Sequence, residues 1–297
     1  MQPSRTDSEA GTCPWLLSFP TNCIERYDRG VHRNIYMTVA YDGTEFHGWQ
    51  TQLGQRTVQE TLEEVIQRTV RHPVELIGSG RTDAGVHAAG QVCNFKTQCE
   101  LDCGKLLHSL ESRLPKDVGI SEVREVHPEF HATRSATSKL YRYRIFNSRH
   151  RPVERFVQQH TYHYWHELNV NWMCAGAAYF VGEKDFSAMV ATGGERESMV
   201  RTVLRCGVER HLDEIHIDVE GTGFLYRQVR NMVGTLMHVG RGAWAPEHVA
   251  EILASKDRTK AGPTVPAHGL CLRWVRYPAA LLKPDPSFER SPDRGAP

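Results

Sequence analysis

The chain has 297 residues, which fits about two domains or one larger domain made of two halves. Hydrophobic residues make up 40% of it and charged residues 24%, so it can bury a core and has an ordinary charge content. The net charge of +1 gives no indication about nucleic acid, and no apolar run approaches the roughly eighteen residues of a membrane span, which excludes a membrane partner.

The first hundred or so residues combine a polar extension with strand and helix patterns. Residues 1–33 are polar and lack hydrophobic periodicity, so we expect a flexible N-terminal extension. Residues 35–41 are rich in strand formers. Thr57 is a good N-cap for a helix, and Glu60 completes a capping-box pattern. A second helix pattern starts near Asp102 and is stopped by a proline.

The most informative stretch is residues 80–87, GRTDAGVH, between predicted strands at 74–77 and 91–95. Its glycines let the backbone bend sharply and let a ligand approach the main chain. Asp83 is ionised at neutral pH, and Arg81 can keep it ionised or bind a phosphate. Such a turn suits covalent chemistry on a nucleotide. The alternative is an ordinary Asp-Gly turn with an incidental arginine.

The rest of the chain continues to alternate strands with helices. Further strand patterns occur at residues 118–126, 140–146, 158–165, 201–209, 214–219 and 270–277. A long helix is expected from Leu225 to Met237, and Pro246 opens another. This alternation in a split β-α-β manner predicts a mixed α+β fold. Residues 279–297 contain four prolines, so we expect a disordered tail.

Basic side chains gather in one part of the chain. Seven Lys or Arg residues against one acid lie between Arg134 and Arg155, a local stripe that an RNA backbone would meet. A solvated surface strand would have the same pattern. Within it, the period of two places Tyr141 and Tyr143 on one strand face and Arg142 and Arg144 on the other.

The cysteines and histidines indicate neither disulfides nor a metal site. Eight scattered cysteines form no Cys-x-x-Cys pair, which predicts reduced thiols and a cytoplasmic location. His160, His163 and His166 follow one another at intervals of three in a strand-like segment, which sends alternate side chains to opposite faces. We therefore expect surface or packing histidines rather than a metal centre.

The block at residues 80–87 resembles the signature of the TruA-type tRNA pseudouridine synthases, and segments elsewhere extend the resemblance over roughly residues 34–277. These segments lie, in order, at residues 41–50, 57–63, 130–143, 224–234 and 268–270. The resemblance implies two ferredoxin-like halves, residues 34–150 and 151–278. Their sheets would join into one mostly antiparallel sheet, with helices on one face and a catalytic cleft between the halves.

The family resemblance also implies an activity. It is the isomerisation of uridine to pseudouridine in the anticodon stem-loop of tRNA, at positions 38–40. The reaction needs no cofactor and no metal, and the family acts as a homodimer on tRNA.

Four residues match the family's site. Asp83 matches the catalytic aspartate, Tyr141 the active-site tyrosine, Arg230 the basic residue of the late helix, and Arg81 an arginine used near the RNA. Two departures are Gln228, where methionine is expected and helix packing could loosen, and an arginine shifted by one place to position 134.

Two other functions compete with this one. The first is a catalytically silent RNA-binding module, since ferredoxin-like sheets often bind RNA through aromatic and basic residues. The presence of Asp83, Tyr141 and Arg230 together argues against it, because binding alone needs no carboxylate beside phosphate. The second is a metal-dependent hydrolase that uses the sixteen histidines.

Overall fold

The computed structural model describes residues 33–191, 193 and 197–284. The expected N-terminal extension lies outside the described residues, apart from Arg33, which begins the first strand. Within the described residues, no helix combines the length and the apolar character that crossing a membrane requires.

The described chain forms one sheet with helices at both ends of it. The strands are β1 (Arg33–Tyr41), β2 (Ile77–Gly78), β3 (His87–Thr97), β4 (Val118–Val126), β5 (Ser138–Phe146), β6 (Tyr162–His163), β7 (Gly182–Asp185), β8 (Val200–His211), β9 (Glu214–Gly221) and β10 (Leu270–Arg276). The helices are α2 (Val58–Val70), α3 (Cys103–Glu111), α4 (Arg155–His160), α5 (Val170–Ala178), α6 (Gln228–Gly240) and α7 (His248–Ser255).

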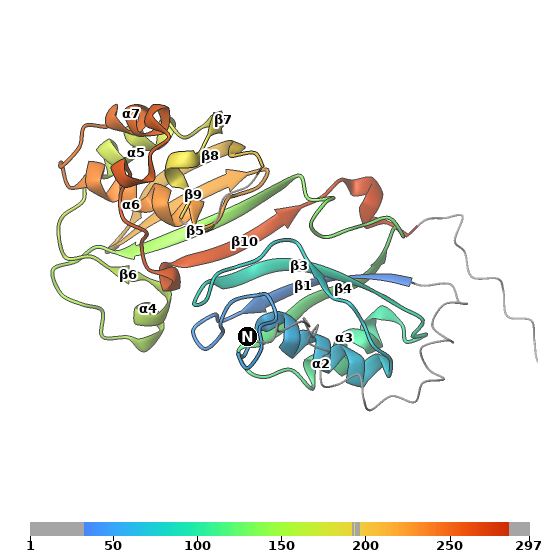
Figure 1. The fold of residues 1–297 in the computed structure, drawn as a ribbon. Coiled ribbons are helices and arrows are strands. Elements are labelled where there is room, and N and C mark those ends of the chain that lie inside the picture. Colours follow the sequence, from blue (N-terminus) through green and yellow to red (C-terminus); the bar gives the residue numbers. More distant parts are fainter. Residues whose placement is uncertain (1–32, 192, 194–196, 285–297) are drawn as a thin grey trace, which may run out of the picture.

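The strand order is β4-β1-β3-β10-β5-β9-β8-β7, with β2 beside β3 and β6 beside β5. Most neighbours are antiparallel, but β10 runs parallel to β3 and so joins the two halves of the sheet. Figure 1 shows α2 and α3 against the β1–β3–β4 end, and α5, α6 and α7 against the β5–β9–β8 end. The predicted α+β fold with one mostly antiparallel sheet is therefore confirmed.

Two hydrophobic cores lie under these helices. One is built on β1, β3 and β4 with the apolar faces of α2 and α3, and the other on β5, β8 and β9 with α5, α6 and α7. Tyr141 contacts both cores. Strand β5, which we expected within the 34–150 half, pairs with β9 and β10 and therefore lies in the second half of the sheet.

Helix α2 begins at the predicted place, but the predicted capping box between Thr57 and Glu60 does not form. The Thr57 hydroxyl is buried without a hydrogen-bond partner. The first amide groups of the helix instead donate to carbonyls of the preceding loop, Val58 to Gly48 and Gln59 to Trp49. A loop packed over the helix start has thus replaced the side-chain cap. The helix start predicted near Asp102 is confirmed, and the Asp102 carboxylate caps it by accepting the Lys105 amide at 2.9 Å.

Two other segments differ from the sequence predictions. Of the strand expected at residues 158–165, only Tyr162–His163 is strand, as β6. Residues 158–160 are the end of helix α4, after which Thr161 Oγ1 donates to the Val157 carbonyl four residues earlier. The expected tail begins with a short 3-10 turn, Ala279–Leu282, whose Leu281 carbonyl accepts the His127 amide. Its leucines pack on the first core, which holds residues 279–282 in place. Residues 285–297 lie outside the described residues.

Candidate active site

The block at residues 80–87 is the turn that leads from β2 into β3. Gly85 has φ +76°, a left-handed conformation that closes the turn, and the Val86 amide donates to the Asp83 carbonyl at 3.1 Å. The opposing loop approaches closely: a Cβ atom on Gly48 would lie 2.7 Å from the Thr82 carbonyl. Glycine at positions 48 and 85 is therefore what lets the two loops hold Asp83 at the surface of a pocket.

Asp83 forms an ion pair with an arginine from the other half of the chain. Arg230, in the first turn of α6, lies with Nη1 2.7 Å from Asp83 Oδ2, 147 residues away in sequence. Its Nε donates to the Val265 carbonyl at 2.8 Å, which fixes the guanidinium plane. The side chains are only 22% and 12% exposed, so solvent screens this pair weakly. The predicted residues Asp83 and Arg230 are therefore brought together.

A second arginine lies at the edge of the same pair. Arg227 Nε is 3.9 Å from Asp83 Oδ2, and its side chain is 40% exposed. Arg227 has φ +56°, a left-handed conformation that is uncommon for residues other than glycine, immediately before α6. From the sequence alone, Arg227 is equally compatible with a solvated helix face and with a phosphate contact.

Tyr141 lies in the same pocket, on the strand face predicted from the period of two. Its ring meets that of Phe224 edge-on, with centroids 5.4 Å apart. Burial, and then the negative charge of Asp83, raise the pKa of Tyr141, so it is a neutral phenol at physiological pH. Tyr143 is fully buried and donates its hydroxyl to the Pro266 carbonyl, as expected for a structural residue.

These residues line one small pocket between the two halves of the sheet, which we call the Asp83 pocket. Its volume is about 120 Å³. Its lining consists of residues 80–83, Val86, Lys139, Tyr141, Phe224, Leu225, residues 227–230 and Leu270. Arg81 is exposed at the edge of the pocket, so all four predicted site residues contribute to it. Lys139 is a pocket residue that the sequence pattern did not single out.

Gln228 corrects an expectation about helix α6. Its side chain is fully buried, and the side-chain oxygen Oε1 accepts a hydrogen bond from the backbone amide of Leu225 at 2.8 Å. The backbone amide of Gln228 in turn donates to the Leu225 carbonyl. The glutamine therefore closes the turn before α6, and the predicted loosening of helix packing is wrong. This turn fixes the start of the helix that carries Arg230.

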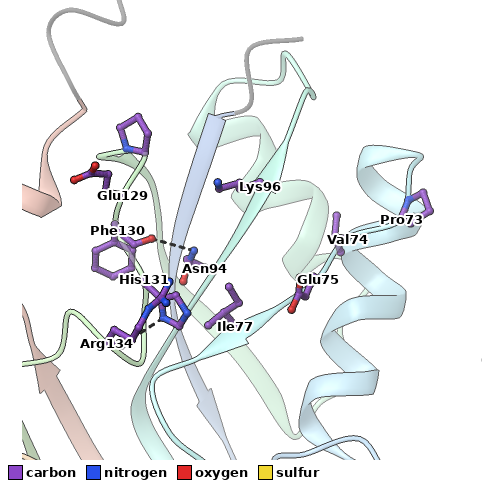
Figure 2. Close-up of a pocket in the computed structure, with 11 residues that line it drawn as sticks. Pro73, Val74, Glu75, Ile77, Asn94, Lys96, Glu129, Phe130, His131 and Arg134 are labelled. Carbon is purple, nitrogen blue, oxygen red and sulfur yellow. Dashed lines mark hydrogen bonds between the residues drawn. The ribbon is translucent and has the colours of Figure 1, made fainter. Parts of the chain in front are cut away.

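A larger hollow lies elsewhere on the first half, with a volume of about 900 Å³ (Figure 2). Basic and acidic side chains share its lining, among them Lys96 and Arg134 with Glu75 and Glu129. Arg134, the arginine shifted by one place, lies here rather than in the Asp83 pocket. None of the four predicted site residues lines this hollow.

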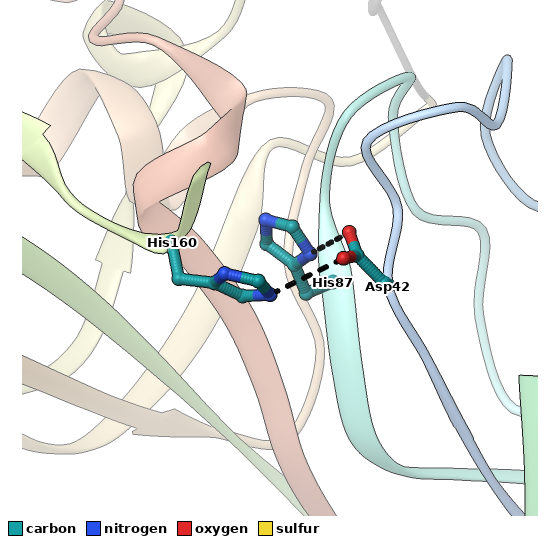
Figure 3. A group of neighbouring side chains, drawn as sticks. All are labelled: Asp42, His87 and His160. Atoms are coloured by element: carbon teal, nitrogen blue, oxygen red, sulfur yellow. Dashed lines mark ion pairs between the residues drawn. The ribbon is translucent and has the colours of Figure 1, made fainter. Parts of the chain in front are cut away.

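A group of Asp42, His87 and His160 is the one place among the described residues where a metal could be held (Figure 3). The ligand atoms lie within 4.8 Å of one another. However, His87 Nδ1 accepts the Gly43 amide at 3.0 Å, so its lone pair is already used. His87 Nε2 lies near the carbonyls of Gln159 and His268 at 3.2 and 3.1 Å, which places its proton there. Hydrogen bonding therefore accounts for the orientation of His87.

This geometry predicts that purified protein contains no stoichiometric metal. Elemental analysis of protein dialysed without chelator checks the prediction. One bound ion per chain, lost on replacing His160, would contradict it and would support the metal-dependent hydrolase.

His87 also predicts how stability depends on pH. Burial, and then the neighbouring His160, lower the pKa of His87, so the folded protein holds it neutral. As the pH falls below about 6.5, the unfolded chain binds a proton at this position that the folded chain does not, and stability is lost. In His87→Asn, an amide oxygen can still accept the Gly43 amide but cannot titrate.

We expect His87→Asn to cost about 1 kcal/mol of unfolding free energy at pH 7.5, and to lose less stability than the wild type between pH 7.5 and 5. Urea unfolding at both pH values measures this. Equal losses in the two proteins would show that His87 does not contribute to the acid dependence.

Comparisons with known proteins show what the chain is similar to. A family model described as tRNA pseudouridine synthase matches residues 37–133 and 177–278. The chain is 44% identical to tRNA pseudouridine synthase A of Thermoanaerobacter sp. (strain X514) over 245 residues, which is 82% of this chain and 100% of that protein. The corresponding protein of Caldicellulosiruptor saccharolyticus is 42% identical with the same coverage. A chain in the crystal structure of a Cbf5-Nop10-Gar1 complex aligns with 14% identity over 68% of this chain and 54% of that chain, with a TM-score of 0.28.

Proposed function

Because the chain belongs to the family of tRNA pseudouridine synthases, we propose that it isomerises uridine to pseudouridine in the anticodon stem-loop of tRNA, at positions 38–40. It is an isomerase that acts on tRNA. The observation that carries the proposal for the site is the Asp83–Arg230 ion pair beside Tyr141 in a pocket of about 120 Å³.

The reaction rearranges bonds within one nucleotide. The N1–C1′ glycosidic bond breaks, the base turns, C5 bonds to C1′ and the C5 proton leaves as N1 gains one. Nothing is oxidised and no group is donated, so the balanced reaction calls for no cofactor. What it does require is an anionic group at the sugar or base and a pocket that retains the detached base away from water.

In this proposal Asp83 is the catalytic carboxylate. Three routes are open to it: it can attack C1′, add to C6, or remove the C2′ proton. Arg230 supports the role because its guanidinium donates a charge-assisted hydrogen bond to one oxygen of the carboxylate and so orients it. With Oδ2 engaged by Arg230, Oδ1 is the oxygen available to the nucleotide.

Tyr141 and Arg81 are proposed to hold the substrate. The phenol ring of Tyr141 offers a flat surface on which uracil can stack, with Phe224 edge-on beside it. Base chemistry requires the target nucleotide to leave its stack, at a cost of a few kcal/mol. Arg81 is exposed at the edge of the pocket, where its planar guanidinium can occupy the vacated space.

We further propose that the enzyme works as a homodimer in the cytoplasm. The family resemblance supports the dimer, and the six cysteines of the described residues, all free thiols, are compatible with a reducing compartment. Light scattering of the purified protein tests the first point, and cell fractionation tests the second.

The central experiment measures tritium released from tRNA labelled at uridine C5. We expect release from tRNA with uridines at positions 38–40 and none from a matched tRNA with cytidines there. Release from both would overturn the assignment of position. Tight tRNA binding without any release would support the silent RNA-binding module instead.

A further inference from the structure

Lys139 is a cation on the floor of the Asp83 pocket that the roles above do not use. It lies two residues before Tyr141 on β5, so both side chains are on the same strand face. Its ammonium group donates to the Ser79 carbonyl at 2.5 Å. A Cβ atom on Gly80 would lie 3.1 Å from Lys139 Nζ, so the glycine leaves room for the ammonium.

This cation has no carboxylate partner. Among the described residues, no Asp or Glu oxygen lies within ion-pair distance of Lys139, although surface lysines of the chain, such as Lys105 and Lys256, are paired. Burial lowers the pKa of Lys139 to about 8. One of its three donors is used by Ser79, which leaves two for a ligand. Lys139 is half-buried, and a charge withdrawn from water without a counter-ion is costly; such groups cluster at functional sites.

The other cations of the pocket are placed differently. Arg230 is committed to Asp83 and to the Val265 carbonyl. Arg227 is 40% exposed and Arg81 is also exposed, so these two lie where phosphates of an RNA backbone would arrive. Lys139 is half-buried and pairs with no carboxylate of the described residues, and it lines the pocket together with Tyr141 and Phe224. Those ring walls suit a flat heterocycle and not a hydrated phosphate group.

We propose that the Lys139 ammonium donates a hydrogen bond to a carbonyl oxygen of the uracil once the base has left C1′. The inference rests on the proposed function and concerns the same pocket. When the N1–C1′ bond breaks, its electron pair stays with the ring, whose charge spreads onto the carbonyl oxygens. No proton is transferred to the ring by Lys139. The charge disappears when C5 uses an electron pair to bond to C1′.

A preorganised donor of this kind stabilises charge that develops only during the reaction, so it acts on kcat rather than on substrate binding. Lys139→Met should therefore lower the single-turnover rate about 10²-fold while changing KM for tRNA less than about threefold. Lys139→Arg keeps a cation and should stay within about tenfold of the wild type. Lys105→Met, an exposed lysine on α3, is the matched control and should behave as the wild type does.

The pH profile distinguishes this role from a merely structural one. The wild-type rate should fall as the pH rises through about 8, because Lys139 loses its proton there. Arginine stays charged, so Lys139→Arg should lack this fall, and Lys139→Met should be slow at every pH. Thermal unfolding shows whether Lys139→Met folds. If it does not, the pH dependence of the rate of Lys139→Arg alone tests the proposal.

Three results would overturn the proposal. A rise in KM with unchanged kcat in Lys139→Met would place the cation on the RNA backbone. If Lys139→Arg is as slow as Lys139→Met, the role of Lys139 is structural, namely its hydrogen bond to the Ser79 carbonyl. A Lys139→Arg profile that falls at the same pH as the wild type would assign that titration to another group. A wild-type protein that releases no tritium is a separate failure, that of the proposed function.

Discussion

Asp83→Asn is expected to abolish tritium release from labelled tRNA, with a loss of at least about 10⁴-fold in the single-turnover rate. The asparagine amide is nearly the same shape as the carboxylate, but it is neither a nucleophile nor a base. All three routes open to Asp83 need the negative charge, so all three are blocked. Binding of tRNA, measured by filter retention, should change by only a few-fold, because the cations around the pocket remain.

The same substitution leaves Arg230 without its counter-ion. Its side chain is 12% exposed, so the unfolding free energy should fall by about 1–3 kcal/mol. Asp117→Asn is the matched control, since Asp117 also pairs with an arginine, Arg56, at 2.6 Å, and neither residue lines the pocket. It should keep full activity. Turnover by Asp83→Asn within tenfold of the wild type would refute the catalytic role.

Arg230→Met is expected to cause the second largest loss, about 10²- to 10³-fold in kcat. Methionine keeps the apolar stem of the side chain but removes the bonds to Asp83 and to the Val265 carbonyl. The carboxylate then loses both its orientation and its nearest positive charge. Arg230→Lys should recover only part of the activity, because a single ammonium cannot match the fixed fork of a guanidinium.

Arg227→Met is the natural comparison for this experiment. Arg227 lies 3.9 Å from the same carboxylate oxygen and is far more exposed, so its removal should reduce kcat by less than about tenfold. Single-turnover rates of both variants under saturating tRNA make the comparison direct. A larger loss of kcat in Arg227→Met than in Arg230→Met would contradict this. It would mean that Arg227, and not Arg230, is the main partner of Asp83 in the complex with tRNA.

The sequence alone predicts the local parts of the site well. The alternation of side chains along β5 places Tyr141 on the pocket face because a strand has a period of two whatever surrounds it. The turn at Asp83 follows in the same way from its glycines and from the strands on either side. These features depend on neighbours within a few residues.

Features that depend on distant segments could not be derived from the residues alone. Nothing local to α6 indicates that Arg230 will reach Asp83, and only the family resemblance brought the two together in advance. Lys139 looks like one member of a basic stripe, and its burial becomes visible only when the loop at Ser79 lies over it. The capping box at Thr57 failed for a related reason, since a loop from elsewhere satisfies the helix start.

The parallel pairing of β10 with β3 has a consequence for how activity arises during synthesis. Strand β10 lies near the end of the chain, yet it is the seam through which β3 and β5 are joined. A nascent chain can pair β1, β3 and β4 early, but Leu272 and Val275 of the first core and the pocket wall at Leu270 are missing until β10 emerges. The complete pocket can therefore form only after β10 has been synthesised.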